Sequence, residues 1–434
     1  MVRSTENIVT NSQILTNPPQ NMQNVFLGLK YLCKFSYLTG SFPVRGGFKT
    51  GKLFMDFTAK KFSWSFFFSC TIGVFIKLCC AAFVPEPVAL STKDRTRFNE
   101  TNSTSVTDLL TTNAGFILLN TFGIITHFLV TLRTAKFLKV ATLLEEYATR
   151  HPTPKAKLFN SWTIGELLCS LFSLTYLTFW AYFCYSELRE TVEFLSLLLI
   201  GGYQPAPWGY AVIYLTALIL LEYSIWFVHM QIFFPTNLIS EFLSDLIHEI
   251  TERSRNYSAE PTFESNKTIK SKSKGRIKSI SWTILNVAND DTFWVTLSSR
   301  YIQIENIVLA FESFVGPCIT ISLAFAVGSS VCMIYIATLS DLVWSSRILR
   351  TCVIQGTCFT AAFRVFAITS VGEMLKEKYA QLRKEIAIAR DRSLSNFSIV
   401  EPRELDNFDR LVHALPLKLN AGGYFVVSRR NVTS

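Results

Sequence analysis

Stretches of about 20 or more mostly apolar residues recur along the chain, and they constrain its fold more than any other feature. A helix needs about 20 such residues to cross roughly 30 Å of hydrocarbon. Within lipid every backbone amide must be paired inside its own segment, and continuous apolarity excludes the alternating strands of a barrel. The sequence therefore predicts an all-α, polytopic transmembrane helix bundle. The six predicted spans cover residues 62–84, 109–132, 161–185, 208–234, 313–337 and 351–372.

The distribution of positive charge predicts the orientation of this bundle. Lys and Arg concentrate on the cytoplasmic side of membrane proteins. Of the 42 basic residues, 34 fall in 1–61, 133–160, 235–312 and 373–434, which we therefore assign to the cytoplasm. The amino terminus is then inside, and the absence of an early apolar segment argues against a cleaved signal peptide.

The chain divides at these boundaries. Residues 1–61 form a cytoplasmic region that is partly disordered, 62–372 form the bundle with a long cytoplasmic loop at 235–312, and 373–434 form a cytoplasmic carboxyl-terminal region that begins with a helix. Helical spacing of apolar residues continues beyond the spans. We expect the continuing segments to form a cytoplasmic helical platform, made of Leu238–Glu252, Val295–Glu312 and 373–390.

The first outer loop, 85–108, carries two N-glycosylation sequons. They start at Asn99 and Asn102, and glycosylation requires an exposed loop on the outer side. We expect both asparagines to be modified. Inside the long loop, basic residues from Lys267 to Lys278 alternate with serines. This pattern is consistent either with a solvated segment near anionic lipid or with an electrostatic switch that phosphorylation controls. The net charge of +10 is this cytoplasmic excess and does not call for nucleic acid.

Polar and aromatic residues within the spans are the candidate functional residues. Ionisable side chains are costly in lipid, and His127 and Glu166 are candidates for an internal polar network. Glu166, His229 and Arg364 lie near predicted inner ends, where we expect water to reach them as an alternative to a functional role. Aromatic residues gather in the outer halves of the third and fourth spans, either as an interfacial belt or as the wall of a small-molecule pocket. The pocket candidates are Tyr176, Trp180, Tyr210 and Tyr214.

The motifs of common enzyme classes are incomplete. Residues 46–52 match the spacing of a phosphate-binding loop, but Leu53 replaces its Ser or Thr, and the glycines instead suit a bend before the first span. His248-Glu249 begins a zinc-protease motif whose second His is replaced by Glu252. The ten Cys show no metal-binding or disulfide spacing and read as small apolar residues. We therefore predict no enzyme activity, no metal and no cofactor.

The carboxyl end carries a family resemblance. Leu411-Val412-His413-Ala414-Leu415 is followed by Pro416-Leu417-Lys418-Leu419-Asn420-Ala421-Gly422-Gly423-Tyr424-Phe425, and a basic turn comes at Arg429-Arg430. This segment resembles the entry to the last membrane helix of insect gustatory receptors. The inside amino terminus, the large second inner loop and the Phe-rich spans extend the resemblance over nearly the whole chain. Gly422-Gly423-Tyr424 is similar to the carbon dioxide-sensing branch.

The resemblance implies a ligand-gated cation channel in the plasma membrane of sensory neurons. Subunits of this family form homo- or heterotetramers joined by cytoplasmic helices, with a small-molecule ligand held in the outer part of the bundle and lipid around it. A seventh span, opening with Thr-Tyr and closing with Gln-Phe, lines the pore, and the chain reaches Ser434 before such a span. We therefore expect an incomplete gene model or a short splice form, with a sensing scaffold but no pore helix.

Three alternative hypotheses for the function remain. A seven-helix G-protein-coupled receptor needs an outside amino terminus, against the eight basic and two acidic residues in 1–61. A membrane enzyme needs a cluster of His, Asp and Glu that the sequence does not show. A structural or modulatory membrane subunit is compatible with the missing pore helix, and it would give ligand-evoked current only with a full-length partner.

Overall fold

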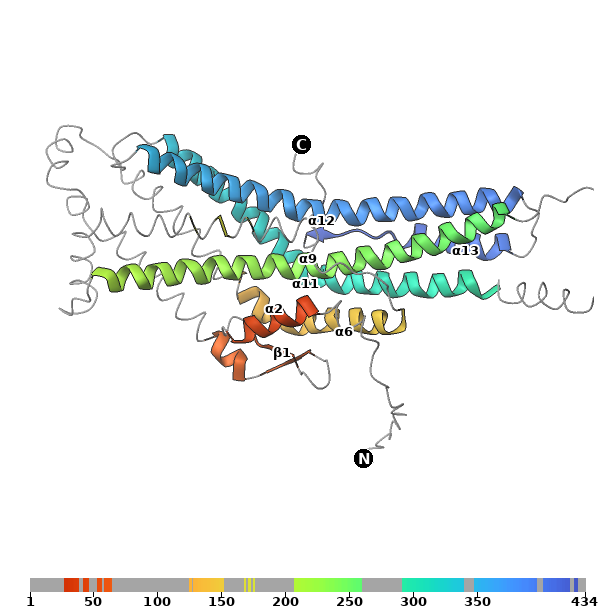
Figure 1. Ribbon diagram of the computed structural model, residues 1–434, viewed down its shortest axis with the longest axis horizontal. Coiled ribbons are helices and arrows are strands. Elements are labelled where there is room, and N and C mark those ends of the chain that lie inside the picture. The colour runs from red at the N-terminus through yellow and green to blue at the C-terminus, as the bar shows by residue number, and fades with distance from the viewer. Residues whose placement is uncertain are drawn as a thin grey trace, which may run out of the picture.

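Figure 1 shows the computed structural model of the chain, in which helices run along one long axis. The structure describes residues 27–38, 42–46, 53–56, 58–64, 125–126, 128–151, 168, 171–172, 175, 207–259, 291–338, 347–395, 401–421 and 425–427. The first three predicted spans lie largely outside these residues.

Three long helices form the body of the molecule. They are α9 (Pro207–Ala259), α11 (Asp291–Thr338) and α12 (Arg347–Ser395), with 53, 48 and 49 residues. At 1.5 Å per residue each is about 70–80 Å long, more than twice the thickness of the hydrocarbon core. The predicted spans 208–234, 313–337 and 351–372 lie within them, and the predicted platform helices are their continuations. The expectation that these three spans extend into a helical platform is therefore confirmed.

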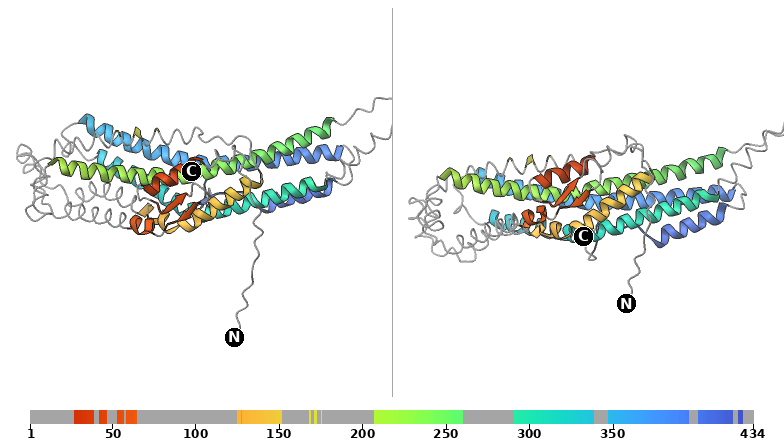
Figure 2. Two further views of the ribbon diagram at one scale, coloured as in Figure 1. Left: turned by 60° about the horizontal axis from the view of Figure 1, so that its bottom comes forward. Right: turned by 90° about the horizontal axis from the view of Figure 1, so that it is seen from below.

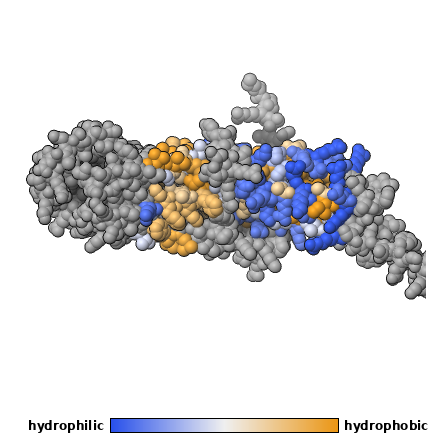
Figure 3. Space-filling model, turned by 90° about the horizontal axis from the view of Figure 1, so that it is seen from above, coloured by the Kyte–Doolittle hydropathy of each residue, from blue (hydrophilic) through white to orange (hydrophobic). Residues whose placement is uncertain are grey.

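The surface changes character along these helices. Hydrophobic side chains gather over one zone of the described surface, and hydrophilic side chains dominate toward the opposite end (Figure 3). Val327, Val331 and Phe359 are about three-fifths exposed within the predicted spans, as expected for side chains that face lipid. Two segments of the described residues are long and apolar enough to cross a membrane, Phe293–Gly328 and Cys358–Ser393.

Shorter elements pack around the middle of the long helices (Figure 2). Helix α2 spans Leu27–Leu38 and α6 spans Thr134–Arg150. The charge of residues 133–160 predicts only the side of the membrane on which they lie, whereas the structure shows that α6 buries an apolar face at three- and four-residue spacing against α11. Phe42 and Phe137 contact one another at 5.3 Å between ring centroids, so this core joins the amino-terminal region to the bundle.

The glycine-rich motif at 46–52 lies in the sequence between two strands that pair with each other. Strand β1 (Val44–Gly46) pairs antiparallel with β2 (Leu53–Met55). A phosphate-binding loop instead joins a strand to a helix whose amino terminus holds the phosphates. After β2, the Asp56 carboxylate accepts a 2.8 Å hydrogen bond from the Thr58 amide and caps the helical turn that begins there.

The carboxyl-terminal segment folds back along the platform. Helix α13 (Glu401–Ala414) is amphipathic and buries Leu405, Phe408 and Val412 against α11 and α12. A second antiparallel pair, β3 (Asn420–Ala421) and β4 (Phe425–Val426), follows it. Residues 411–414, where the family resemblance begins, form the last turn of α13.

Candidate functional site

The sequence-predicted ligand and modification residues lie outside the described side chains. Tyr210 and Tyr214 are on the first turns of α9, where the structure describes only the backbone. The others fall outside the described residues, namely Tyr176, Trp180, His127, Glu166, Asn99 and Asn102. Their roles stay predictions, and the site that can be built residue by residue lies at the base of the bundle and in the platform.

Two intramembrane candidates are described, and both are buried in protein. His229 on α9 is 1 % exposed and lies against the Phe233 ring, and Arg364 on α12 is 9 % exposed. The expectation that water reaches them is wrong in this structure, because the neighbouring helices cover both side chains. Each has interaction partners within the protein.

A proline in α11 creates a polar contact where the predicted fifth span begins. Pro317 has no amide hydrogen, so the carbonyl of Ser313 four residues earlier lacks its helical donor. The Arg133 guanidinium donates to that oxygen at 2.6 Å, and Lys136 Nζ donates at 3.3 Å. These two hydrogen bonds to the Ser313 carbonyl therefore link α11 to the start of α6.

Two tyrosines hold the end of α13 to the platform. The Tyr301 hydroxyl on α11 donates to the Leu415 carbonyl at 2.6 Å, and the Tyr379 hydroxyl on α12 donates to the Val412 carbonyl at 2.8 Å. The carbonyls at a helix end have no intrahelical partner, so these hydroxyls act as carboxyl-terminal caps. Burial raises the pKa of both phenols, which keeps them protonated as donors.

The strand pair packs against α11 and α12 near the predicted inner ends of the fifth and sixth spans. Asn420 Nδ2 donates to Glu312 Oε1 on α11 at 2.9 Å, and the Val427 amide donates to the Leu419 carbonyl at 2.8 Å. A Cβ atom placed on Gly372 of α12 would lie 2.8 Å from the Val427 carbonyl carbon and closer still to its oxygen. Only a glycine allows the returning chain to come this near to α12.

A partly buried ion pair joins α9 and α11 inside the platform. Arg300 is 8 % exposed, and its Nη1 lies 2.6 Å from both carboxylate oxygens of Glu249. The guanidinium also donates from Nε to the Tyr147 hydroxyl on α6, at 3.4 Å. Burial by itself would lower the pKa of Arg300, but the hydrogen bond to Glu249 and the Tyr147 contact reverse that and raise it. One side chain thereby links three helices.

Asp245, one turn before Glu249 on α9, is a proton-sensitive group in this cluster. Burial, followed by repulsion from Glu241, raises its pKa to about 6, while Arg300 and His248 oppose the rise and Glu249 adds to it. A carboxyl with a raised pKa in the folded state binds more protons folded than unfolded. Stability therefore falls as pH rises from about 4 to about 6, and it is insensitive to this group above that.

Replacing Asp245 should remove this component. We expect Asp245→Asn to raise the Tm of the detergent-purified protein at pH 7.5, where the wild-type carboxylate is charged, to raise it by about half as much at pH 5, and to leave it nearly unchanged below about pH 4. The measurement is the Tm of both proteins across this pH range, since the difference cancels other titrating groups such as His151. A constant difference between the two proteins would contradict the prediction.

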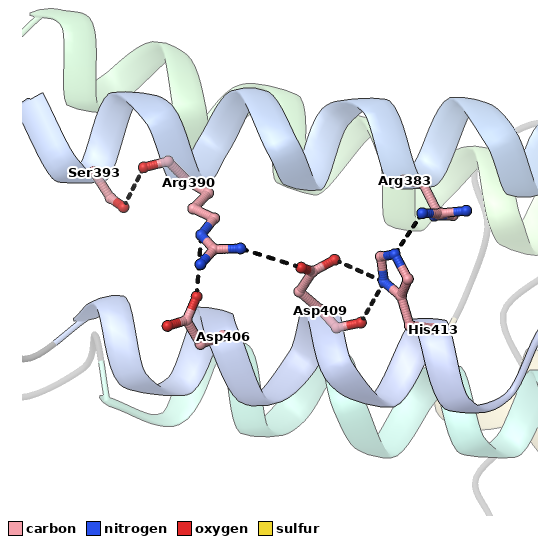
Figure 4. Close-up of polar contacts among 6 residues, drawn as sticks. All are labelled: Arg383, Arg390, Ser393, Asp406, Asp409 and His413. Carbon is pink, nitrogen blue, oxygen red and sulfur yellow. Dashed lines mark hydrogen bonds and ion pairs between the residues drawn. The ribbon is translucent and has the colours of Figure 1, made fainter.

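A row of charged contacts joins α12 to α13 near the end of the platform (Figure 4). Arg390 Nε lies 3.2 Å from Asp406 Oδ1, and its Nη1 lies 3.6 Å from Asp409 Oδ2. His413 Nδ1 lies 3.2 Å from Asp409 Oδ1, and its Nε2 contacts the Arg383 guanidinium. The spacing of Asp409 and His413, four residues apart, is the sequence signal that would have indicated this shared helix face.

The polar contacts described above connect helices to one another. Burial raises the pKa of the Cys33 thiol to about 12, so it is not a ready nucleophile. Within the described ranges, no group of three or more His, Cys, Asp or Glu side chains could hold a metal ion. The contacts instead connect the ends of α9, α11 and α12 with α6, α13 and the final strand pair.

Comparison with known proteins places this fold. No protein-family model matches the sequence, and no curated protein matches it significantly. Among solved structures, the insect olfactory receptor OR5 from Machilis hrabei matches with a TM-score of 0.55 and 10 % identity, over 95 % of each chain. The same receptor in complex with eugenol matches with a TM-score of 0.57 and 11 % identity, again over 95 % of each chain.

At this identity the match concerns the fold. The chain has the architecture of an insect olfactory receptor, which confirms the predicted all-α membrane helix bundle. The solved structures that share this fold are structures of an insect olfactory receptor.

Proposed function

We propose that this chain is a subunit of a chemosensory, ligand-gated cation channel of the insect chemoreceptor type, in the plasma membrane of sensory neurons. The observation that carries the proposal is the fold match to an insect olfactory receptor over 95 % of both chains. The carboxyl-terminal resemblance to gustatory receptors makes taste, or carbon dioxide detection, the sense that we propose. The positive amino-terminal region argues against the G-protein-coupled alternative.

The proposed ligand is a small organic molecule that binds between the outer halves of the helices. The matched receptor has been solved in complex with eugenol, a small phenol. Aromatic side chains such as Tyr176, Trp180, Tyr210 and Tyr214 offer flat apolar walls and hydroxyl or indole donors suited to molecules of that kind. We further propose that His127 and Glu166 form an internal polar network near this pocket, and that Asn99 and Asn102 carry glycans.

Assembly into a homo- or heterotetramer is proposed through the platform, and α11 has a face suited to it. Val295, Ile302 and Leu309 recur every seven residues and are 54 %, 40 % and 52 % exposed. Ser299 and Asn306 lie between them, so exposed uncharged residues follow one another at alternating spacings of four and three. The apolar residues follow the seven-residue spacing of one position of a coiled-coil seam, with Ser299 and Asn306 at the other, and we propose that this stripe, the seam, packs against a similar stripe of another subunit.

A charge in the seam should therefore prevent assembly without unfolding the subunit. We expect Ile302→Glu to shift the purified protein from an oligomer to a monomer, because the carboxylate would be buried against an apolar partner. Native mass spectrometry in detergent measures the subunit number. Thr142→Glu on the exposed face of α6 is the matched control and should leave assembly unchanged. An unchanged oligomer for Ile302→Glu would contradict this role of α11.

Heterologous expression tests the proposed function. The chain is expressed alone and together with a full-length insect chemoreceptor, and whole-cell current is recorded during application of small phenols, sugars, bitter compounds and carbon dioxide. Current that requires this chain and is lost in Trp180→Ala supports the channel-subunit function. Current only in co-expressing cells identifies a modulatory subunit, which is the second candidate. Surface-expressed protein without evoked current under either condition contradicts the proposal.

A further inference from the structure

We propose that the groove between α12 and α13 is a binding site for a soluble, phosphate-bearing organic anion. The groove has a cavity volume of about 310 Å³. That volume exceeds the need of a single phosphate ion and is at the lower end of small-molecule sites. Ala380 and Ala387 lie seven residues apart on α12 and line the groove, and their short side chains leave room that longer ones would fill.

The charges that line the groove are not balanced. Arg383, Lys384 and Arg390 contribute three positive charges, against one carboxylate from Asp409. Arg390 is already paired, since Asp406 and Asp409 both contact it. Lys384 has no ion-pair or hydrogen-bond partner within the part of the chain that the structure describes. Two adjacent cations therefore lack a carboxylate.

Arg383 is held by a neutral acceptor that a phosphate oxygen can replace. Its guanidinium points toward His413 Nε2, and His413 Nδ1 faces the Asp409 carboxylate (Figure 4). Because Nδ1 donates to Asp409, the lone pair on Nε2 accepts from Arg383. A phosphate is a stronger acceptor and forms two parallel hydrogen bonds with a guanidinium. Arg383 would therefore exchange His413 for the ligand, with Lys384 as the second cation.

The depth of the groove favours a soluble ligand over a lipid headgroup. Arg383 lies eleven residues beyond residue 372, the predicted inner end of the sixth span. At 1.5 Å per residue it is about 17 Å from the hydrocarbon edge. The headgroup layer adds only about 5–8 Å on each side of the hydrocarbon. A lipid phosphate in the same membrane would not reach the groove.

Binding of ATP and of inorganic tripolyphosphate to the purified full chain in nanodiscs tests the site, measured by microscale thermophoresis at fixed salt. We expect saturable binding of both probes and a loss of about tenfold or more in the Arg383→Gln/Lys384→Gln variant. His413→Ala should bind at least as tightly as the wild type, because it removes only the competing acceptor. Lys376→Gln, which alters a cation outside the groove, is the matched control. The Tm of each variant verifies folding.

Three outcomes would overturn the proposal. Equal losses in the double variant and in Lys376→Gln would mean non-specific attraction to a basic platform. Absence of saturable binding would mean that the groove holds no phosphate ligand. Binding only in nanodiscs that contain phosphatidylinositol bisphosphate, and none of the soluble probes, would assign the site to a lipid.

Discussion

Gly372→Ala is expected to lower the stability of the protein by about 3 kcal/mol, the upper end of the range for overpacking a well-packed site. The added Cβ would collide with the backbone carbonyl of Val427, whose carbon lies 2.8 Å from the position that the Cβ would take. A side chain could rotate away from such a clash, but a backbone carbonyl can move only with its strand. Either the strand pair leaves α12 or α12 bends.

Thermal unfolding of the purified protein measures the loss, and limited proteolysis after α13 reports whether the strand pair has detached. Gly328→Ala on α11 is the matched control, because nothing lies within 4 Å of its added Cβ. Alanine has the higher helix propensity, so the control should be neutral or stabilising by up to about 1 kcal/mol. Equal Tm values for the two variants would mean that the final strand does not pack on α12.

The contrast between these two glycines shows why part of the fold could not be predicted from the sequence. Both sit inside long helices, and neither has a local pattern that distinguishes it. What differs is a strand that returns to α12 from more than fifty residues downstream. By contrast, the fourth to sixth spans and their platform extensions were predictable, because apolar length and helical spacing are local properties of the chain.

Helix α6 was missed for a different physical reason. Its Lys and Arg residues predict a cytoplasmic segment, and charge alone carries no information on secondary structure. The buried face that includes Phe137, Leu144 and Tyr147 is nevertheless spaced for a helix. Orientation and local structure are separate inferences, and the same residues can support both.

The candidate site was only partly accessible to sequence reasoning. Lone polar residues in apolar spans point to function through their cost in lipid, and that argument selected His229 and Arg364 but not their surroundings. Arg300 and Glu249 are 51 residues apart on different helices, and each alone is an ordinary charged platform residue. Their pairing depends on the packing of α9 against α11, so it could be found only in the structure.

The second large effect concerns the same ion pair. Removing one partner is expected to lower stability more than removing the other. Glu249→Ala should cost about 2 kcal/mol, because it leaves the buried guanidinium of Arg300 without a carboxylate. This figure is below the usual cost of breaking a fully buried pair, since the Glu249 side chain is 39 % exposed. Arg300→Leu should cost about 1 kcal/mol or less, because the orphaned Glu249 can be hydrated and leucine suits the apolar surroundings.

The double variant separates an ion pair from two independent contributions. If Arg300 and Glu249 act as a pair, Glu249→Ala adds little once Arg300→Leu has removed the buried charge, so the double variant should resemble Arg300→Leu alone. The measurement is the Tm of the four proteins at one scan rate and pH 7.5. Glu252→Ala, which alters a side chain 62 % exposed one turn further along α9, controls for general loss of acidic charge. Strictly additive losses would mean that the two residues contribute independently. A larger loss for Arg300→Leu than for Glu249→Ala would mean that other contacts of the guanidinium, such as that with Tyr147, outweigh the ion pair.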